Sequence, residues 1–215
     1  MKKFSLLLSG LFFIISVFAT SKASIPIKEG VDYTVIATSP ITKNAKNQPV
    51  NVKEFFAFAC IHCKDLEPLL ETYMKTNAKK VNLEKIHAVW GEDPTMQGLA
   101  KLNATLQMLK LNQLYQPVFN AIFARQNLTD RIVLKSFLAT NKLKPADIDK
   151  FFAVYDSFDV NAMVGKYKTM TLNPVYGING TPTIIVADKY ILKPAQAPRL
   201  IEVINTLVNM NNKAK

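Results

Sequence analysis

The sequence predicts an α/β fold in which a block of helices interrupts a small sheet. Three observations lead to this prediction. β-like runs occur on both sides of the middle of the chain, a helix-periodic segment directly follows the strongest of these runs, and the stretch 95–171 shows helical spacing with no convincing strand. Strands on either side of a purely helical stretch indicate one sheet with a helical insertion.

The first residues have the layout of a secretory signal peptide. A basic start is followed by the apolar run 6–19, and Ser21 and Ala23 are small residues suited to cleavage before Ser24. The apolar run is shorter than the about 20 residues that span a bilayer. We therefore expect an exported protein from which residues 1–23 are removed, an uncleaved anchor being the alternative.

The first half of the exported chain contains three strand candidates. The run 33–36 is short, and the run 50–58 is the strongest. Both parities of 50–58 are apolar toward its end, which is typical of a central strand covered on both faces. The run 81–89 alternates again, and a helix is expected before it because apolar residues from Leu66 to Tyr73 recur at helical spacing.

The second half begins with the helical stretch, for which breaks are expected near 127–130 and near 141. The runs 183–187 and 190–192 then predict a β-hairpin, and an amphipathic helix over 197–210 follows it. The expected organisation is a signal peptide at 1–23, a sheet-containing domain at 24–94 and 172–215, and a helical insertion at 95–171.

The chain is basic, with a formal net charge of +11 at pH 7. Its lysines are scattered or paired rather than gathered in a stripe, which favours solvated faces over a nucleic-acid-binding surface. Export also argues against a genomic target. No nucleic-acid partner is expected.

The cysteine count indicates chemistry rather than a structural disulfide. The chain has only two cysteines, Cys60 and Cys63, with two residues between them. A disulfide across so short a loop restrains the unfolded chain little, whereas exported proteins with structural disulfides carry several widely spaced cysteines. A reactive pair is therefore expected, with the redox-active Cys60–Cys63 disulfide and no other cofactor.

The tetrad Cys60-Ile61-His62-Cys63 stands where the strand 50–58 leads into a helix. A cysteine is a nucleophile only as the thiolate, and the unpaired amides and partial positive charge of a helix N-terminus favour that anion. His62 adds ring donors or a positive charge, and Cys63, one turn later, can resolve a mixed disulfide. This tetrad, with the order of strands and helices around it, predicts a thioredoxin-like α/β fold with an inserted all-helical subdomain.

Two other uses of the tetrad are weaker. Covalent haem attachment requires histidine directly after the second cysteine, and Lys64 stands there instead. A structural zinc site requires four ligands, which Cys60, Cys63, His62 and His87 could supply only with poor geometry. We expect no metal, and a structural role for His87.

The stretch from Glu54 to Cys63 closely resembles the active site of the DsbA family of periplasmic disulfide oxidases. The stretch Gly30 to Tyr33 resembles the entry to that family's first strand, and Gly177 to Pro182 resembles its cis-proline loop. The helical insertion and the last helix fit as well, so the resemblance covers nearly all of the exported chain. It implies a bacterial protein of the periplasm, a depressed cysteine pKa and an oxidising disulfide.

The resemblance also assigns roles to individual residues. It implies that Cys60 is the attacking cysteine, that Cys63 is its buried partner and that His62 tunes the Cys60 thiolate. Pro182 matches the cis-proline that faces the disulfide, and Thr181 before it offers backbone groups to an extended client. From sequence alone, Pro182 could instead be an ordinary proline at the start of a strand.

Glu54 shares strand parity with Val52 and Phe56, so its carboxylate is expected to point into the core. A buried acid requires a partner or a raised pKa. Lys85 lies on the next strand and matches the family's charged partner beneath the active site. The hypothesis is that Glu54 and Lys85 tune or relay protons to Cys63, the alternative being an acid at a strand end that reaches solvent.

Two positions depart from the family pattern. Ile61 stands where many members have proline, and Thr181 replaces the commoner valine before the cis-proline. Both are expected to contact the client and the sulfur environment. They leave open the redox potential and the balance between oxidase and isomerase activity.

The leading functional prediction is a dithiol oxidase that introduces disulfides into reduced exported clients. The resemblance implies reoxidation by a quinone-linked membrane partner of the DsbB type, and a monomer is expected. The alternatives are a disulfide isomerase or reductase of the same fold, to which Thr181 lends weight, and a non-enzymatic periplasmic binding protein or chaperone.

Overall fold

The computed structural model describes residues 26–36 and 48–213, so the predicted signal peptide at 1–23 lies outside the described residues. Five strands form one mixed sheet in the order β1-β5-β4-β2-β3. Strand β2 pairs parallel with β3 and antiparallel with β4. The strands are β1 (Tyr33–Val35), β2 (Val50–Phe56), β3 (Val81–His87), β4 (Thr183–Val186) and β5 (Tyr190–Leu192).

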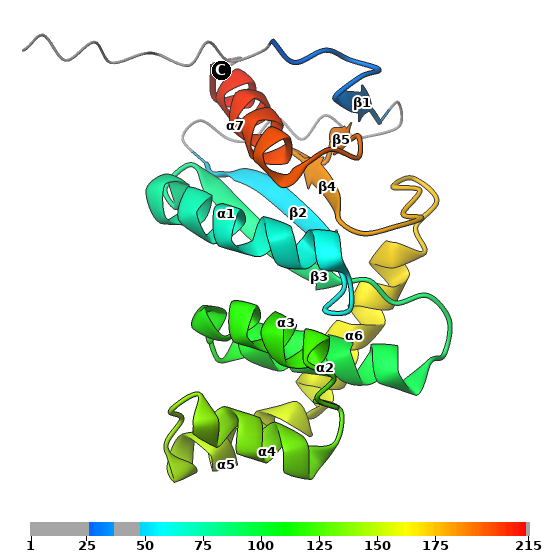
Figure 1. The fold of residues 1–215 in the computed structure, drawn as a ribbon. Coiled ribbons are helices and arrows are strands. Elements are labelled where there is room, and N and C mark those ends of the chain that lie inside the picture. The colour runs from blue at the N-terminus through cyan, green and yellow to red at the C-terminus, as the bar shows by residue number, and fades with distance from the viewer. Residues whose placement is uncertain (1–25, 37–47, 214–215) are drawn as a thin grey trace, which may run out of the picture.

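Helices α1 and α7 lie side by side over one face of the sheet, and the remaining helices fill the stretch between β3 and β4 (Figure 1). The predicted α/β class with inserted helices is therefore confirmed. No helix within the described ranges combines the length and apolarity needed to cross a bilayer. The helices are α1 (Ile61–Asn77), α2 (Pro94–Met108), the 3-10 turn η1 (Asn112–Leu114), α3 (Tyr115–Phe123), α4 (Arg131–Thr140), α5 (Pro145–Tyr155), α6 (Phe158–Thr171) and α7 (Ala197–Lys213).

Strand parity divides the core of the sheet into two parts. Val52 and its neighbours of the same parity pack against α1 and α7. Phe55 and Ile185 face the other way and pack with residues of α2 and α6. Both faces of the sheet are thus covered, as the apolar run in β2 predicts.

A third cluster joins the end of the sheet to the inserted helices. Phe56, Phe58 and Cys63 pack with apolar residues of α2, α3, α4 and α5, among them Leu102 and Phe119. The end of β2 and the start of α1 therefore lie against the helical block, so the cysteine pair stands at the boundary between the two parts of the fold.

Two predicted strands are shorter than their apolar runs. β2 ends at Phe56 rather than at residue 58, because the Phe58 N–H donates to His87 Nε2 at 3.3 Å instead of to a neighbouring strand. β3 ends at His87 rather than at residue 89, and the Val89 N–H donates to the Thr171 hydroxyl at 3.2 Å. Side chains replace strand partners at both ends.

The helical block has the two expected breaks and two further ones. The helices are interrupted between α3 and α4 and between α4 and α5, as predicted. They are also interrupted around Lys110 and at Asp156–Ser157. Lys110 has φ 55°, a left-handed conformation in which a non-glycine residue is uncommon. No glycine or proline marks the Lys110 break in the sequence, so its prediction from pattern was not possible.

Candidate active site

Cys60 caps the N-terminus of α1. Its extended backbone, with φ −94° and ψ 119°, ends the loop from β2, and its Sγ accepts a hydrogen bond from the Cys63 N–H at 3.4 Å. Both cysteines are free thiols; Cys60 is partly buried and Cys63 is fully buried. The sulfur therefore lies where helix amides point, as the tetrad's position predicts.

The surroundings lower the pKa of Cys60 from 9.0 to about 5. Hydrogen bonding from the Cys63 side chain is the largest cause, and the Thr181 side chain and the backbone N–H groups of Cys63 and His62 add to it, while burial opposes it. Burial, by contrast, raises the pKa of Cys63 far above its ordinary value. One thiol of the pair is thus a thiolate at neutral pH and the other keeps its proton.

His62 and Ile61 lie on the exposed side of the first helical turn. The His62 backbone N–H helps to lower the pKa of Cys60, and the predicted effect of the His62 ring stays a prediction. Ile61 is 46% exposed at the first position of α1. It is therefore accessible to a protein client, and its predicted contact with one stays a prediction.

Thr181, which precedes Pro182, lies against Cys60. Their peptide bond is cis, as the resemblance implies. The Thr181 carbonyl oxygen lies 3.2 Å from Cys60 Sγ and accepts a hydrogen bond from its thiol. The Thr181 carbonyl can accept a hydrogen bond only from the protonated Cys60 thiol. The Thr181 hydroxyl stabilises the Cys60 thiolate by donating a hydrogen bond to it.

A groove of about 730 Å³ runs beside the tetrad. Its walls come from the first turns of α1, from the segment around Pro182 and from the segment that leads into α7, and they include His62, Asp65, Leu69, Thr181, Pro182 and Gln196. The groove is lined by His62 and Thr181, which are neighbours of Cys60, and its open shape suits an extended peptide.

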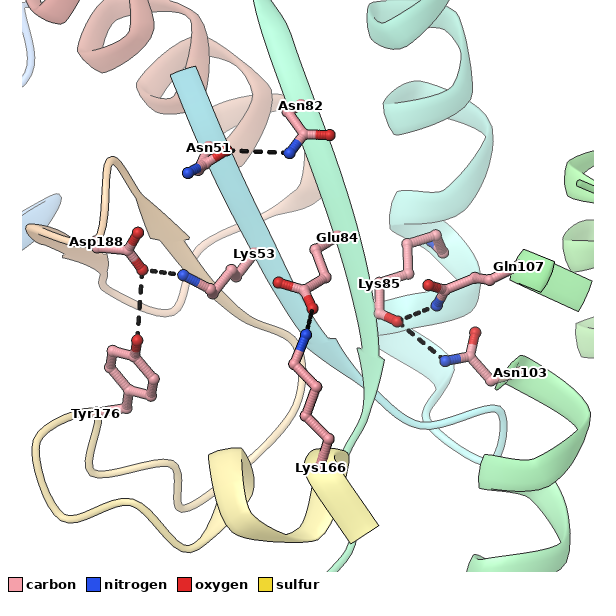
Figure 2. A network of polar contacts seen from close by, with 10 residues as sticks. All are labelled: Asn51, Lys53, Asn82, Glu84, Lys85, Asn103, Gln107, Lys166, Tyr176 and Asp188. Carbon is pink, nitrogen blue, oxygen red and sulfur yellow. Dashed lines mark hydrogen bonds and ion pairs between the residues drawn. The ribbon is translucent and has the colours of Figure 1, made fainter. Parts of the chain in front are cut away.

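Glu54 and Lys85 meet beneath the cysteines, as strand parity predicts. They are partners in the parallel β2–β3 register, and Lys85 Nζ lies 2.6 Å from Glu54 Oε2. Glu54 is fully buried, so the alternative of a strand-end acid that reaches solvent is wrong. From α2, Asn103 and Gln107 donate hydrogen bonds to the Lys85 main-chain carbonyl and so fix this part of β3 (Figure 2).

Glu67 is a third member of this cluster that sequence reasoning missed. Its Oε2 lies 2.5 Å from Lys85 Nζ, and its side chain is also buried. The signal was present, because Glu67 follows Cys63 by four positions and falls between Leu66 and Leu70 on the apolar face of α1. An acid on the buried face of a helix requires a partner.

The cluster holds two carboxylates around one ammonium group. Burial raises the pKa of Glu54 even though Lys85 lowers it. Burial alone would lower the pKa of Lys85, but Glu54 and Glu67 together outweigh burial and raise it. Among the described residues, Glu54 Oε1 has no hydrogen-bond partner. The charge of Glu54 also contributes to the raised pKa of Cys63, which couples the cluster to the redox pair.

His87 has a structural environment. It is buried, its Nε2 accepts the Phe58 N–H, and burial lowers its pKa to about 4. Within residues 26–36 and 48–213, no group of three or more histidine, cysteine or acidic side chains is arranged to hold a metal ion.

Comparison with known proteins gives one consistent result. Residues 42–206 match the family model described as Thioredoxin. The chain is 31% identical to the thiol:disulfide interchange protein DsbA of Bordetella parapertussis over 76% of this chain and 78% of that protein. It is 30% identical to the protein of the same name from Burkholderia cepacia, over 83% of each chain.

Solved structures agree with the sequence comparison. The oxidoreductase NmDsbA1 of Neisseria meningitidis superposes with a TM-score of 0.72 at 30% identity, over 87% of this chain and 95% of that one. DsbA of Pseudomonas aeruginosa gives a TM-score of 0.73 at 20% identity, over 86% and 94% of the two chains, which speaks for the fold alone.

Proposed function

Because the chain belongs to the thioredoxin family, and within it to the DsbA family of thiol:disulfide oxidoreductases, we propose that Cys60 and Cys63 carry its disulfide-introducing activity. The observation that supports this assignment is the environment of Cys60. Its sulfur caps α1, faces Thr181 and Pro182, and has a pKa lowered to about 5. A stabilised thiolate favours the reduced pair and makes the disulfide a stronger oxidant.

The reaction proceeds in two exchanges. A client thiolate attacks Cys60 Sγ of the oxidised pair; a client–Cys60 disulfide forms, the Cys60–Cys63 bond breaks, and Cys63 leaves as a thiolate that takes up a proton. A second client thiolate then attacks the client sulfur of this mixed disulfide and releases the Cys60 thiolate. The client loses two electrons and the protein gains them, with no cofactor other than the cysteine pair.

Glu54 and Lys85 supply or accept the proton of Cys63 in this scheme. Cys63 leaves as a thiolate in a buried site. Because burial raises its pKa, this thiolate is a strong base, and an acid beside it can protonate it. Glu54 has a raised pKa, lies close enough to influence the Cys63 charge, and keeps one oxygen without a hydrogen-bond partner among the described residues. Lys85 holds the other oxygen in place.

The clients are reduced exported proteins, and the site of action is the bacterial periplasm, where disulfides persist. The signal-peptide pattern in residues 1–23 supports this location. Each cycle leaves the pair reduced, so an oxidant must restore the disulfide. A quinone-linked membrane protein of the DsbB type fits that role, and the protein acts as a monomer.

Titration of Cys60 tests the assignment. The rate of Cys60 alkylation in the reduced protein is expected to rise with a midpoint near pH 5. Because folding lowers this pKa from 9.0, the thiolate stabilises the reduced fold fully above about pH 9, and the contribution is lost as the pH falls through about 5. A midpoint near pH 9 in the alkylation rate would contradict the proposal. Equilibration of the protein with glutathione is a second measurement: it gives the redox potential, which distinguishes an oxidase from a reducing isomerase.

Replacing Thr181 with valine is expected to raise the pKa of Cys60 by roughly 1 unit, because one hydroxyl donor to the thiolate is lost while the shape of the side chain is kept. The disulfide should become correspondingly less oxidising. Alkylation against pH measures the first effect and glutathione equilibration the second. Thr183→Val is the matched control, since the Thr183 hydroxyl donates to the Gly180 carbonyl and not to Cys60; an equal shift in both variants would contradict the role of Thr181.

A further inference from the structure

The segment 172–182 connects α6 to β4 and carries the Thr181–Pro182 pair. It lies outside the regular helices and strands. Sheet pairing of this part of the chain starts only at Thr183, opposite Phe55. Within 172–182, Ile178 has the only buried side chain. The backbone that faces Cys60 therefore depends on contacts from elsewhere for its position.

The Thr183 hydroxyl and the Cys60 thiol donate hydrogen bonds to the Gly180 and Thr181 carbonyls of this segment. Two further side-chain hydrogen bonds tie the segment to the loop after β3 and to the turn between β4 and β5. The Trp90 indole N–H, just after β3, donates to the Ile178 carbonyl at 3.2 Å. The Tyr176 hydroxyl donates to Asp188 Oδ1, at 3.4 Å, in the turn between β4 and β5. Lys53 of β2 forms an ion pair with the same Asp188 oxygen, so this contact is anchored on the central strand (Figure 2).

The rings of both residues also pack against the core. Trp90 and Tyr176 lie partly buried against the cluster that contains Phe55 and Ile178. The centroids of the Tyr176 and Phe55 rings are 5.9 Å apart. Trp90 and Tyr176 thus each add a hydrogen bond and ring packing to the contacts of this segment, at Ile178 and Tyr176, both close in sequence to Thr181.

We propose that Trp90 and Tyr176 are positioning residues that hold the Thr181–Pro182 backbone in place to receive a protein client. This inference rests on the proposed thiol exchange at Cys60. An extended client requires backbone partners at fixed places beside the reactive sulfur, and small displacements of such partners slow a reaction strongly. A small thiol such as glutathione requires little more than access to the sulfur.

The test compares two substrates for the oxidised protein, a reduced two-cysteine peptide and glutathione. Trp90→Phe keeps an aromatic ring and removes the indole donor, and Tyr176→Phe removes only the hydroxyl. Each variant is expected to lower the ratio of the peptide rate constant to the glutathione rate constant by roughly two- to tenfold, the range for loss of one hydrogen bond. The glutathione rate constant should stay within about twofold of the wild type.

Tyr167→Phe is the matched control. Tyr167 belongs to the same cluster, and its buried hydroxyl has no hydrogen-bond partner among the described residues, so its loss should leave the ratio unchanged. An unchanged ratio in both loop variants, an equal fall for both substrates, or the same fall in the control would overturn the inference. If Trp90→Phe does not fold, Tyr176→Phe decides alone. Failure of the proposed function is distinct, because the wild type itself would then react with neither substrate faster than a free thiol.

Discussion

Replacing Cys60 with serine is expected to abolish disulfide exchange, leaving the rate at the level of a reaction without protein. A hydroxyl neither forms a disulfide nor ionises near neutral pH, so no mixed disulfide with a client arises. Cys60 is also partly exposed, whereas Cys63 is buried. The effect is measured as the rate at which a reduced two-cysteine peptide loses its free thiols in the presence of the oxidised protein.

Cys63→Ser gives the opposite signature and is the control for this experiment. Cys60 can still react in this variant, but no internal thiol can resolve the product, so a mixed disulfide with a disulfide-bearing client should accumulate. Electrophoresis with and without reductant would detect the adduct. Exchange retained in Cys60→Ser, together with adduct formation through Cys63, would reverse the assigned roles. Cys63 is fully buried, which makes such a reversal incompatible with the geometry.

Replacing Lys85 with methionine is expected to lower the free energy of unfolding at neutral pH by about 3–5 kcal/mol. The change leaves the buried carboxylates of Glu54 and Glu67 without their common cation, and loss of one partner from a buried ion pair carries a penalty of that size. Chemical denaturation of the reduced protein measures the loss. Lys166→Met, which removes the more exposed pair with Glu84, should cost less than about 1 kcal/mol.

The loss in Lys85→Met should shrink as the pH falls. Folding raises the pKa of Glu54 above 4.5, so its contribution is most favourable below about pH 4.5 and is lost as the pH rises through the folded pKa. Removal of Lys85 raises that folded pKa further, because the cation that lowered it is gone. A destabilisation that is independent of pH would point to lost packing rather than to uncompensated charge.

Glu54→Gln separates the proton role from stability. Glutamine retains an oxygen for Lys85 but cannot carry a proton to Cys63. If the pH dependence of Cys63 reactivity were the same in this variant and in the wild type, Glu54 would have no part in proton transfer. The structural contact with Lys85 would then be its whole contribution.

The central part of the site was predictable because it depends on local pattern. Strand parity turned Glu54 inward, and the parallel β2–β3 register then placed Lys85 opposite it. The helix that follows β2 put Cys60 at its N-terminus. Each of these relations involves regular elements whose side-chain directions follow from a period of two or 3.6 residues.

Other contacts could not be predicted because they join segments that no local pattern relates. Trp90 and Ile178 are 88 positions apart, and both lie in irregular backbone. The early end of β2 depends on the acceptor at His87, which competes with sheet pairing only once the fold exists. Glu67 differs from these, since its place on the apolar face of α1 was visible in the sequence.

Cys63 lies where the inserted helices pack against the start of α1, so these helices affect the environment of the cysteine pair. Cys63 packs in the same apolar cluster as Leu102 of α2 and Phe119 of α3, so the inserted helices contribute to its burial. Burial among apolar side chains disfavours the Cys63 thiolate and raises its pKa, whereas the pKa of Cys60 is lowered. The environment of the cysteine pair is thus formed jointly by α1 and the inserted helices.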